Sequence, residues 1–381
     1  MNFADKFSVE LTRQPLYRQV KHRILRSFED KKPGDRLSTE AEYVKAFGVS
    51  ITTIRQAVRE LEQEGWIERR QGSGTFLLDF SSRENTHVAI LLDVDIASDN
   101  LHPYWLKVMR EIKKALKAEG VSTRLYYGDL PLGTEATGLT CEDLLDDVRL
   151  DRVRGLVSFF TRRSSAWTDL LAKKSIPFVD PQSAWVQQLN LRHTEAFVRS
   201  ALQYFRQNEC SLVASLVWEG GRADDHAYSE TLLRLAPEYG IRVDSCLLDN
   251  TAGGWERGMG WERFRDIWHS GRQKPDALLI AEDALFADCQ QAILEMGISV
   301  PEELKIVARS SDALELNPRF PIFNWKLLTA PVATLYARQI KALVEGRPEI
   351  VPQVPFFAEE LLGGDISNAP SFPPVSPLPT P

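Results

Sequence analysis

The chain has 381 residues, of which 43% are hydrophobic and 26% charged, an ordinary composition for a globular protein with sizeable cores. This length exceeds one typical domain and predicts two or three. The composition excludes disorder for most of the chain, and no apolar run of 18 residues predicts a transmembrane helix. Four scattered cysteines without a CxxC pair and an N-terminus unlike a signal peptide predict a cytoplasmic protein without a metal site.

The net charge of −7 is unevenly distributed along the chain. Residues 1–80 hold 14 lysines and arginines against 12 acidic residues, whereas residues 81–381 hold 32 against 41. The first segment therefore carries +2 and the second −9. Only the N-terminal segment is suited to lie against a polyanion such as nucleic acid.

The N-terminal segment begins with two predicted helices. The first starts at Pro15, and a stripe of apolar residues recurs every four positions: Leu16, Val20, Ile24 and Phe28. Its outer face is expected to carry Arg18, Lys21, Arg23 and Arg26. The second helix opens at Thr39, where Glu42 completes a capping box, and ends near Gly48. Its apolar face consists of Tyr43, Val44 and Phe47.

A third helix and a hairpin follow. Ser50 is the predicted cap of a helix whose buried stripe is Ile51, Ile54, Val58 and Leu61. Thr52, Arg55, Gln56 and Arg59 share the opposite face, so the second and third helices form a helix-turn-helix that presents donors to base edges. Residues 66–70 and 75–78 predict two strands joined by Gln71-Gly72-Ser73-Gly74. This hairpin is a wing whose glycines allow close approach to a sugar-phosphate backbone.

Residues 15–78 resemble the winged-helix DNA-binding domain of GntR-family regulators, with several blocks matching at once. The wing, the turn and the recognition helix together imply DNA contacts from Arg36, Thr39, Ser50, Thr52, Thr53, Arg55, Gln56, Arg59, Gln71, Gly72, Ser73 and Gly74. Ala41 and Ile51 stand where the family favours arginine, which implies a different operator. The alternative is a winged helix used for protein contacts, with arginines that only solvate its surface.

Beyond a polar linker at residues 81–86, strands alternate with helices. Strand-like runs begin near His87, Val121, Gly155, Ser211, Val243, Asp276 and Leu304. Helical segments lie between them at residues 105–119, 194–207, 225–238 and 285–296. This alternation predicts an α/β fold with doubly wound parallel sheets covered by helices. The proline-rich tail, residues 365–381, is expected to be disordered.

Residues 87–362 resemble the effector domain of LacI/GalR repressors, itself similar to periplasmic sugar-binding proteins. The matching segments are residues 88–95 with the following His102-Pro103-Tyr104-Trp105, and residues 176–180, 275–283 and 297–304. Gly254-Trp255 with Gly260-Trp261 resembles the segment of the lactose repressor whose tryptophan flanks the sugar. A GntR-type head on this body resembles the architecture of arabinose repressors. It implies two α/β lobes, residues 87–364, with a ligand between them.

A sugar site combines an aromatic plate with carboxylates and amides that bind hydroxyl groups. The candidates are Asp93, Asp95, His102, Tyr104, Trp105, Trp185, Arg222, Trp255, Glu282, Asp283, Arg309 and Ser310. Glu282 replaces an asparagine usual in the family, and Arg309-Ser310-Ser311 stands where a sugar-hydroxyl acceptor is normally found. These departures leave the ligand's identity open, and an arginine in the site would also suit an anion.

The leading interpretation is a homodimeric transcriptional regulator, a repressor controlled by a carbohydrate-like effector and needing no cofactor. Two heads on a palindrome discriminate DNA better than one. Alternatives are a sugar-processing enzyme with a DNA-binding head and a solute-binding transport component. Enzymatic motifs such as GxSxG, HExxH or a Walker loop do not occur, and the paired acids Asp146-Asp147 and Asp224-Asp225 are interpreted as solvated charges. The sequence leaves the effector, the operator and the sign of regulation open.

Overall fold

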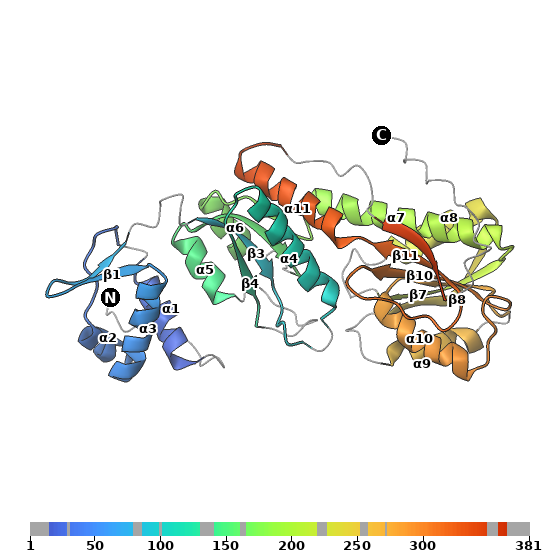
Figure 1. The fold of residues 1–381 in the computed structure, drawn as a ribbon, viewed down its shortest axis with the longest axis horizontal. Helices are drawn as coiled ribbons and strands as arrows, with labels where there is room; N and C mark the ends of the chain where they lie inside the picture. The colour runs from blue at the N-terminus through green and yellow to red at the C-terminus, as the bar shows by residue number, and fades with distance from the viewer. Residues whose placement is uncertain are drawn as a thin grey trace. The chain divides into compact units, whose positions relative to one another are not determined.

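The computed structural model describes residues 15–28, 31–78, 86–98, 101–129, 141–160, 165–218, 227–251, 258–270, 273–348 and 357–363. The chain divides into two compact units (Figure 1). Unit 1 comprises Met1–Asp93, Gly120–Asp129 and Ala136–Phe178, and unit 2 comprises Val94–Glu119, Leu130–Glu135 and Val179–Pro381. The predicted linker and proline-rich tail fall outside the described residues, apart from Thr86. Within the described ranges, no helix has the length and apolarity needed to cross a bilayer.

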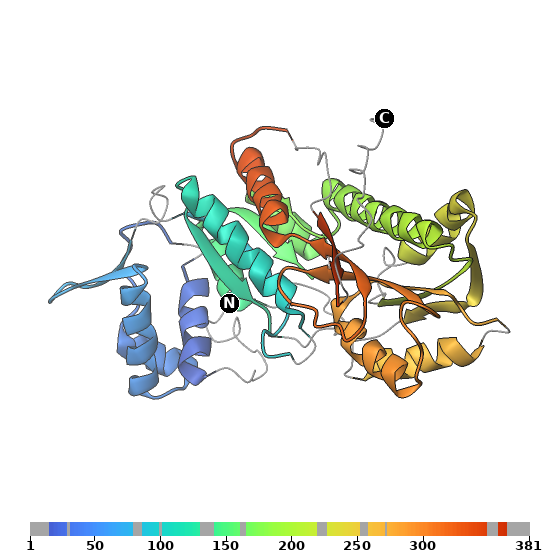
Figure 2. The same ribbon diagram turned by 45° about the vertical axis from the view of Figure 1, so that its right-hand side comes forward.

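The N-terminal part of unit 1, here called the head, is a winged helix. Its elements are α1 (Leu16–Arg26), α2 (Glu40–Phe47), α3 (Ile51–Gln63), β1 (Ile67–Arg70) and β2 (Gly74–Leu77). The strands pair antiparallel, and Figures 1 and 2 show this hairpin projecting from the helices. A buried core holds the helices together: Val20, Ile24, Leu25, Phe28, Leu37, Tyr43, Phe47, Ile54, Ala57, Val58, Leu61, Trp66, Ile67 and Leu77.

Local signals correctly predicted where helices α2 and α3 begin. The Thr39 hydroxyl accepts from the Glu42 amide while the Glu42 carboxylate accepts from the Thr39 amide, which confirms the capping box. The Ser50 hydroxyl accepts from the Thr53 amide and caps α3 as predicted. The sequence missed one feature: the backbone at Arg36 forms an antiparallel bridge with Phe76 and so extends the wing.

Three burial predictions in the head are wrong. Leu16 and Ile51 are 47% and 39% exposed, because each is the first residue of its helix and lies before the turn that packs on the core. Lys21, predicted on the outer face of α1, is only 7% exposed. Its ammonium group lies 2.7 Å from the Glu64 carboxylate, which compensates the buried charge.

Unit 1 also contains the first lobe, an α/β sheet. Its elements are β3 (His87–Leu92), β4 (Thr123–Tyr127), α5 (Glu142–Arg149), β5 (Val153–Phe159), α6 (Ser165–Lys173) and β6 (Phe178–Val179). The strand order is β4-β3-β5-β6, and β3 runs parallel to both of its neighbours. Leu144 of α5 and Leu171 of α6 pack with Leu91 and Leu156 of the sheet.

Unit 2 contains the second lobe, a six-stranded sheet in the order β12-β11-β10-β9-β7-β8. The strands are β7 (Leu212–Trp218), β8 (Arg242–Thr251), β9 (Ala277–Ile280), β10 (Lys305–Ser311), β11 (Ile322–Leu327) and β12 (Phe357–Leu362). The helices are α4 (Pro103–Ala118), α7 (Ala184–Gln207), α8 (Ala227–Leu235), η3 (Ala236–Tyr239), α9 (Met259–Ser270), α10 (Asp283–Glu295) and α11 (Thr329–Val344). All strand pairs from β8 to β11 are parallel, whereas β12 pairs antiparallel with β11.

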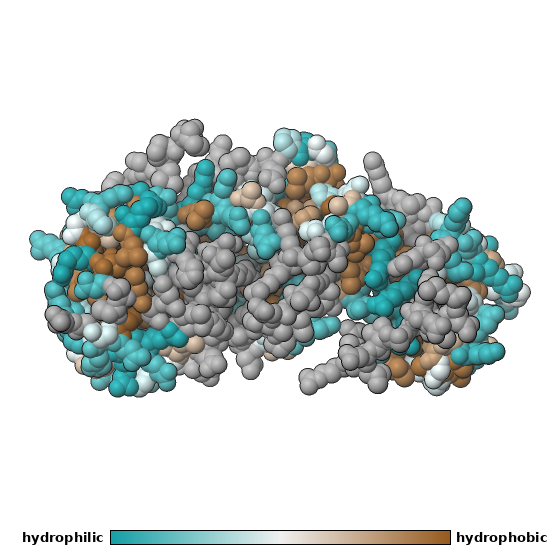
Figure 3. Space-filling model, turned by 180° about the vertical axis from the view of Figure 1, so that it is seen from behind, coloured by the Kyte–Doolittle hydropathy of each residue, from teal (hydrophilic) through white to brown (hydrophobic). Residues whose placement is uncertain are grey.

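Helices cover both faces of the second sheet, as the predicted doubly wound fold requires. Helices α7 and α8 pack on one face and α9 and α10 on the other (Figure 1). Alternate strand residues such as Val213 and Leu216 enter opposite cores, which explains why these strands read as continuous apolar runs. On the face in Figure 3, apolar residues surface in several separate groups among polar ones.

We predict that Ile54→Ala lowers the free energy of unfolding of the head by about 2–5 kcal/mol, because Ile54 is fully buried. The matched change Ile51→Ala should cost within about 0.5 kcal/mol, since that side chain is exposed. Hydrogen exchange of α3 amides in the full chain, measured without DNA, compares the two. Equal losses of protection would contradict this packing.

Candidate DNA-binding face and effector site

The residues predicted to contact DNA are accessible. Ten of the twelve are exposed, and Thr53 and Gly74 are half-buried. Arg55 on α3 and Arg69 on β1 both pair with the Glu40 carboxylate, at 3.0 Å and 3.1 Å. Glu40 thereby joins the recognition helix to the wing. Because exposed ion pairs contribute about 0–1 kcal/mol, Arg55 can exchange this partner for a DNA phosphate or base at little cost.

The wing turn depends on its glycines. Gly72 has a φ of 74° and Gly74 a φ of 121°, backbone conformations that side chains with a Cβ rarely adopt. A Cβ on Gly74 would lie 2.8 Å from the Arg36 Nε, whereas Gly72 has open space around it. Because Gly74 has no side chain, Arg36 can lie against the turn. The open space around Gly72 leaves the tip of the wing free to approach a binding partner.

A set of charged side chains gathers at the carboxyl ends of strands β9 and β10 in unit 2. Glu282 and Asp283 follow β9 directly, and Arg309 lies near the end of β10. The order of strands reverses between β7 and β9, because β8 lies on the far side of β7. Ligands of open parallel sheets bind beyond the carboxyl ends of the strands at such a switch point.

Arg309 is the centre of this set. Its guanidinium group donates hydrogen bonds to the Glu282 carboxylate and to the Tyr228 hydroxyl, and it lies 5.1 Å from the centre of the Tyr228 ring. Burial raises the pKa of Glu282, while the charge of Arg309 opposes that effect. Both side chains are half-buried, at 20% and 25% exposure, and each compensates the charge of the other.

His102 and Asp283 form the second pair. His102 Nε2 lies 2.6 Å from the Asp283 carboxylate, and His102 Nδ1 accepts a hydrogen bond from the Tyr104 amide. The other Asp283 oxygen accepts from the amide and hydroxyl of Ser311. Burial lowers the pKa of His102, but the hydrogen bond and charge of Asp283 outweigh burial, so the pKa lies above its ordinary value.

Sequence reasoning missed two members of this cluster, Tyr228 and His193. His193 on α7 is buried, and its Nε2 has no hydrogen-bond partner among the described residues. Burial and then the charge of Arg309 lower the pKa of His193 to about 4, so its ring is neutral at physiological pH. Nothing in the local sequence marks a histidine within a long helix as part of a polar site. Hereafter "the effector cluster" means His102, His193, Tyr228, Glu282, Asp283 and Arg309.

The other predicted effector residues have different surroundings. Tyr104 is in electrostatic range of Arg309, and its ring meets Trp105 edge-on at 5.1 Å. Trp185 is buried and packs edge-on against Tyr336 at 4.9 Å. Asp95 accepts the amide of Ala97 in its own turn, and Asp93 is buried after β3 in unit 1. Arg222, Trp255 and the pair Asp224-Asp225 lie outside the described residues.

Ser310 differs from its neighbour Arg309, with which it was predicted to bind the effector. Successive side chains of a strand point to opposite faces, so Ser310 and Arg309 leave β10 on different sides. It is the next residue, Ser311, that contacts Asp283. Ser310 is buried, and its hydroxyl has no partner among the described residues.

Comparison with known proteins supports both halves of this arrangement. Residues 12–77 match the bacterial regulatory proteins of the gntR family, and residues 202–351 match the periplasmic binding protein-like domain. The chain is 38% identical over 317 residues to the arabinose metabolism transcriptional repressor of Halalkalibacterium halodurans, covering 78% of this chain and 80% of that protein. The chain belongs to the GntR family of transcriptional regulators.

Further relatives agree with this assignment. The arabinose metabolism transcriptional repressor of Geobacillus stearothermophilus is 24% identical over 313 residues, covering 77% of the regulator described here and 81% of that repressor. The solved complex of the transcriptional regulator CelR with cellobiose superposes with a TM-score of 0.54 at 14% identity, covering 92% of the regulator and 100% of CelR. This likeness shows a shared fold.

The interpretation of Asp146-Asp147 as solvated charges is wrong for this regulator. Asp146 and Asp147 are 2% and 1% exposed, and both carboxylates have partners. Asp146 Oδ2 lies 2.5 Å from His22 Nδ1, and Asp147 accepts the Tyr126 hydroxyl and lies 2.8 Å from Arg124. His22, Glu142 and Asp146 also bring ligand atoms within 4.8 Å of one another, a spacing that suits a metal ion. Ion pairs between side chains already engage all three.

We predict that the His102 imidazole in the intact regulator titrates above its ordinary value of about 6.5. Asp283→Asn should lower its pKa, because the change removes the neighbouring negative charge. The control Asp312→Asn, which breaks an ion pair with Lys107 instead, should change it little. NMR titration of the assigned ring measures all three. A His102 pKa at or below 6.5, or one unmoved by Asp283→Asn, would refute the pairing.

Proposed function

We propose that this regulator is a repressor whose affinity for its operator changes when a small, neutral carbohydrate binds at the effector cluster. The relatives named above are transcriptional regulators, and we extend that role, without enzymatic activity, to this chain. The observation that carries the proposal is the presence of two ion pairs, Arg309 with Glu282 and His102 with Asp283, at the carboxyl ends of the second sheet.

The charges of the effector cluster favour a neutral ligand over an anion. Arg309 is already neutralised by Glu282, and Asp283 by His102. An anion entering this set would meet two cations that are each already paired with a carboxylate, and it would also face those two carboxylates. A sugar hydroxyl group, which both donates and accepts, can instead bond to a carboxylate oxygen and to a guanidinium or imidazole nitrogen. The cluster therefore fits a polyhydroxylated molecule better than an acidic one.

The relatives suggest where to begin the search for the ligand. Two of them are named for arabinose metabolism, and the solved CelR complex contains cellobiose. We therefore propose a panel of neutral pentoses, hexoses and disaccharides, with L-arabinose and cellobiose as the first probes. Sugar acids in the same panel test the anionic alternative.

The DNA-binding unit is proposed to be a homodimer that reads a palindromic operator with two heads. A single winged helix buries too little DNA for high specificity, whereas two half-sites approximately multiply the discrimination. The twelve residues predicted from the sequence remain the proposed DNA contacts. Arg55 is the donor to test first, because its side chain is exposed and its ion pair with Glu40 is weak.

Arg55→Ala should weaken binding to the operator by about 1–3 kcal/mol, as for the loss of one base or phosphate contact. Arg23→Ala on α1 is the matched control and should leave affinity unchanged, because Arg23 lies outside the proposed contacts. Fluorescence anisotropy with an operator selected from random duplexes measures both. If Arg55→Ala binds as tightly as the unmodified protein, α3 does not read DNA in the proposed way.

Arg309→Gln should weaken sugar binding by at least about tenfold, because it removes charged donors from the site. DNA affinity without sugar should stay within about twofold. Arg338→Ala, an exposed arginine on α11, is the control in the same unit. Calorimetry with the probe sugars and anisotropy with the operator provide the two readouts. Unchanged sugar affinity in a folded Arg309→Gln protein would exclude the effector cluster as the site.

A further inference from the structure

Helix α1 of the head carries a basic stripe that DNA recognition does not use. Arg18, His22 and Arg26 recur every four residues and so lie along one side of the helix. Val20, Ile24 and Leu25 belong to another side, which fills the core of the head. None of the twelve proposed DNA contacts belongs to this helix.

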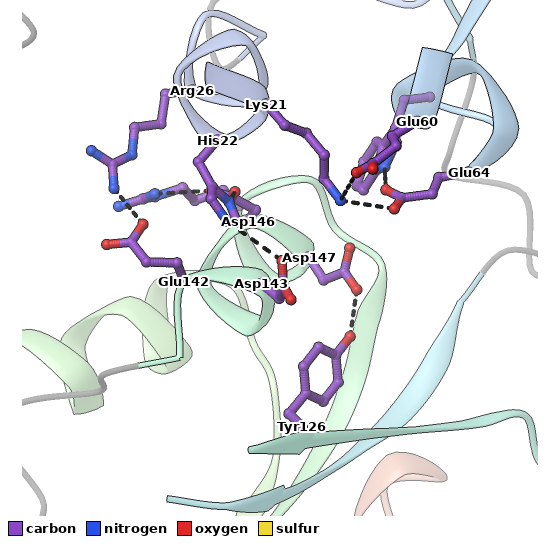
Figure 4. A network of polar contacts seen from close by, with 12 residues as sticks. Lys21, His22, Arg26, Glu60, Glu64, Tyr126, Glu142, Asp143, Asp146 and Asp147 are labelled. Atoms are coloured by element: carbon purple, nitrogen blue, oxygen red, sulfur yellow. Dashed lines mark hydrogen bonds and ion pairs between the residues drawn. The ribbon is translucent and has the colours of Figure 1, made fainter. Parts of the chain in front are cut away.

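The basic stripe meets an acidic stripe on α5 of the first lobe (Figure 4). His22 contacts Asp146 at 2.5 Å through Nδ1 and approaches Asp143 at 3.6 Å through Nε2. Arg26 pairs with Glu142, and the negative charge of Asp143 also attracts the positive charge of Arg18. These contacts join residues more than 100 positions apart in the chain.

A second set of contacts lies beside the two stripes. The guanidinium group of Arg152, which follows α5, lies 2.9 Å from the centre of the Trp66 ring of the head. It also donates to the Glu64 carbonyl at 3.4 Å. Leu150 packs against the hydrophobic core of the head. Aromatic, apolar and ionic contacts therefore all connect the same two surfaces.

The burial of these charges shows that the two surfaces are matched. His22 is 6% exposed and Asp146 2% exposed, and opposite charges compensate both: they contact each other, His22 also approaches Asp143, and Asp146 lies 3.3 Å from Arg149. Asp147 accepts a hydrogen bond from the Tyr126 hydroxyl (Figure 4). Asp147 also pairs with Arg124, and the Tyr126 hydroxyl lies 2.7 Å from His87 Nε2. This chain of hydrogen bonds connects the contact surface to strands β3 and β4 of the lobe.

We propose that the head docks on the first lobe through the basic stripe of α1 and the acidic stripe of α5, and that head and lobe move as one body. The dock would then fix the position of the recognition helix and wing relative to the lobe. Its consequence for regulation rests on the proposed function, because a lobe that shifts on binding a sugar would carry its head with it.

A charge-swap cycle tests the dock in the full chain without DNA or sugar. Arg26→Glu and Glu142→Arg should each accelerate amide exchange in both α1 and α5 by about tenfold, because each places like charges together. The double variant restores opposite charges and should return exchange to within about twofold of the unmodified protein. Arg23→Glu is the control on the same helix. Peptides of α3 report whether the head remains folded.

Two results would overturn the dock: protection that survives both single reversals, or a double variant no better protected than the singles. If a charge reversal unfolds the head, the neutral variants Arg26→Gln and Glu142→Gln replace the reversals. They should show the same joint loss of amide protection in α1 and α5. Loss in α1 alone would also contradict the proposal, because docked surfaces must open together.

The consequence for DNA binding has its own readout. The unmodified protein should bind a selected palindrome at least about tenfold more tightly than the same half-sites moved apart by a few base pairs. Arg26→Glu should lose this preference while retaining binding to each half-site. A preference that persists in Arg26→Glu would overturn the positional role of the dock. If the unmodified protein selects no DNA sequence, the proposed function fails, whereas the exchange experiment still decides the dock.

Discussion

A charged side chain can be buried only if an opposite charge or a full set of hydrogen bonds replaces the water that it loses. In the second lobe, this constraint applies most strongly to Asp283, which is 4% exposed and pairs with His102. It also favours the half-buried pair of Arg309 with Glu282. Because each charge holds the other in place, these polar groups are already oriented for the sugar that we propose. A ligand that supplies hydroxyl groups then adds hydrogen bonds without having to desolvate an isolated charge.

The same constraint connects the head to the first lobe. Asp146 and Asp147 are almost completely buried, and their counter-charges come from different parts of unit 1. His22 lies outside the core of the head and is nevertheless buried, because it pairs with Asp146 of the first lobe. In this account, DNA recognition and effector binding use separate residues, and ion pairs within unit 1 provide a physical link between the head and its neighbouring lobe.

The features that could be predicted from the sequence are those whose determining residues lie close together along the chain. The capping box at Thr39 and the cap at Ser50 depend on residues three positions apart and were predicted correctly. The alternation of apolar strands with helices predicted the α/β fold, because each strand or helix is recognised from residues only a few positions apart. Ile51 was wrongly predicted to be buried, because the apolar stripe of a helix does not show which turn of the helix first contacts the core. The edge strand β12 was missed because its Glu359 and Glu360 interrupt the apolar pattern.

The candidate sites likewise contain some residues that local sequence signals indicate and others that only the tertiary packing brings together. Glu282, Asp283 and Arg309 were predicted to share one site, and the structure brings them to one edge of the sheet, because they lie near the carboxyl ends of neighbouring parallel strands. His193 and Tyr228 were missed because only the packing of α7 and α8 brings them to Arg309. Asp146 appeared solvated because its partner His22 lies 124 residues earlier in the chain. No pattern within a short window can reveal such a pair.

The central claim is that one chain couples a sugar site to a DNA site, and thermodynamic reciprocity tests it most directly. Operator affinity is measured over a series of concentrations of the sugar that binds, and affinity for that sugar is measured with and without saturating operator. The account predicts that the sugar changes the dissociation constant for DNA by the same factor as DNA changes that for the sugar, typically about 5–150-fold. A sugar that binds the protein equally well with and without operator, and leaves operator affinity unchanged, would contradict the account.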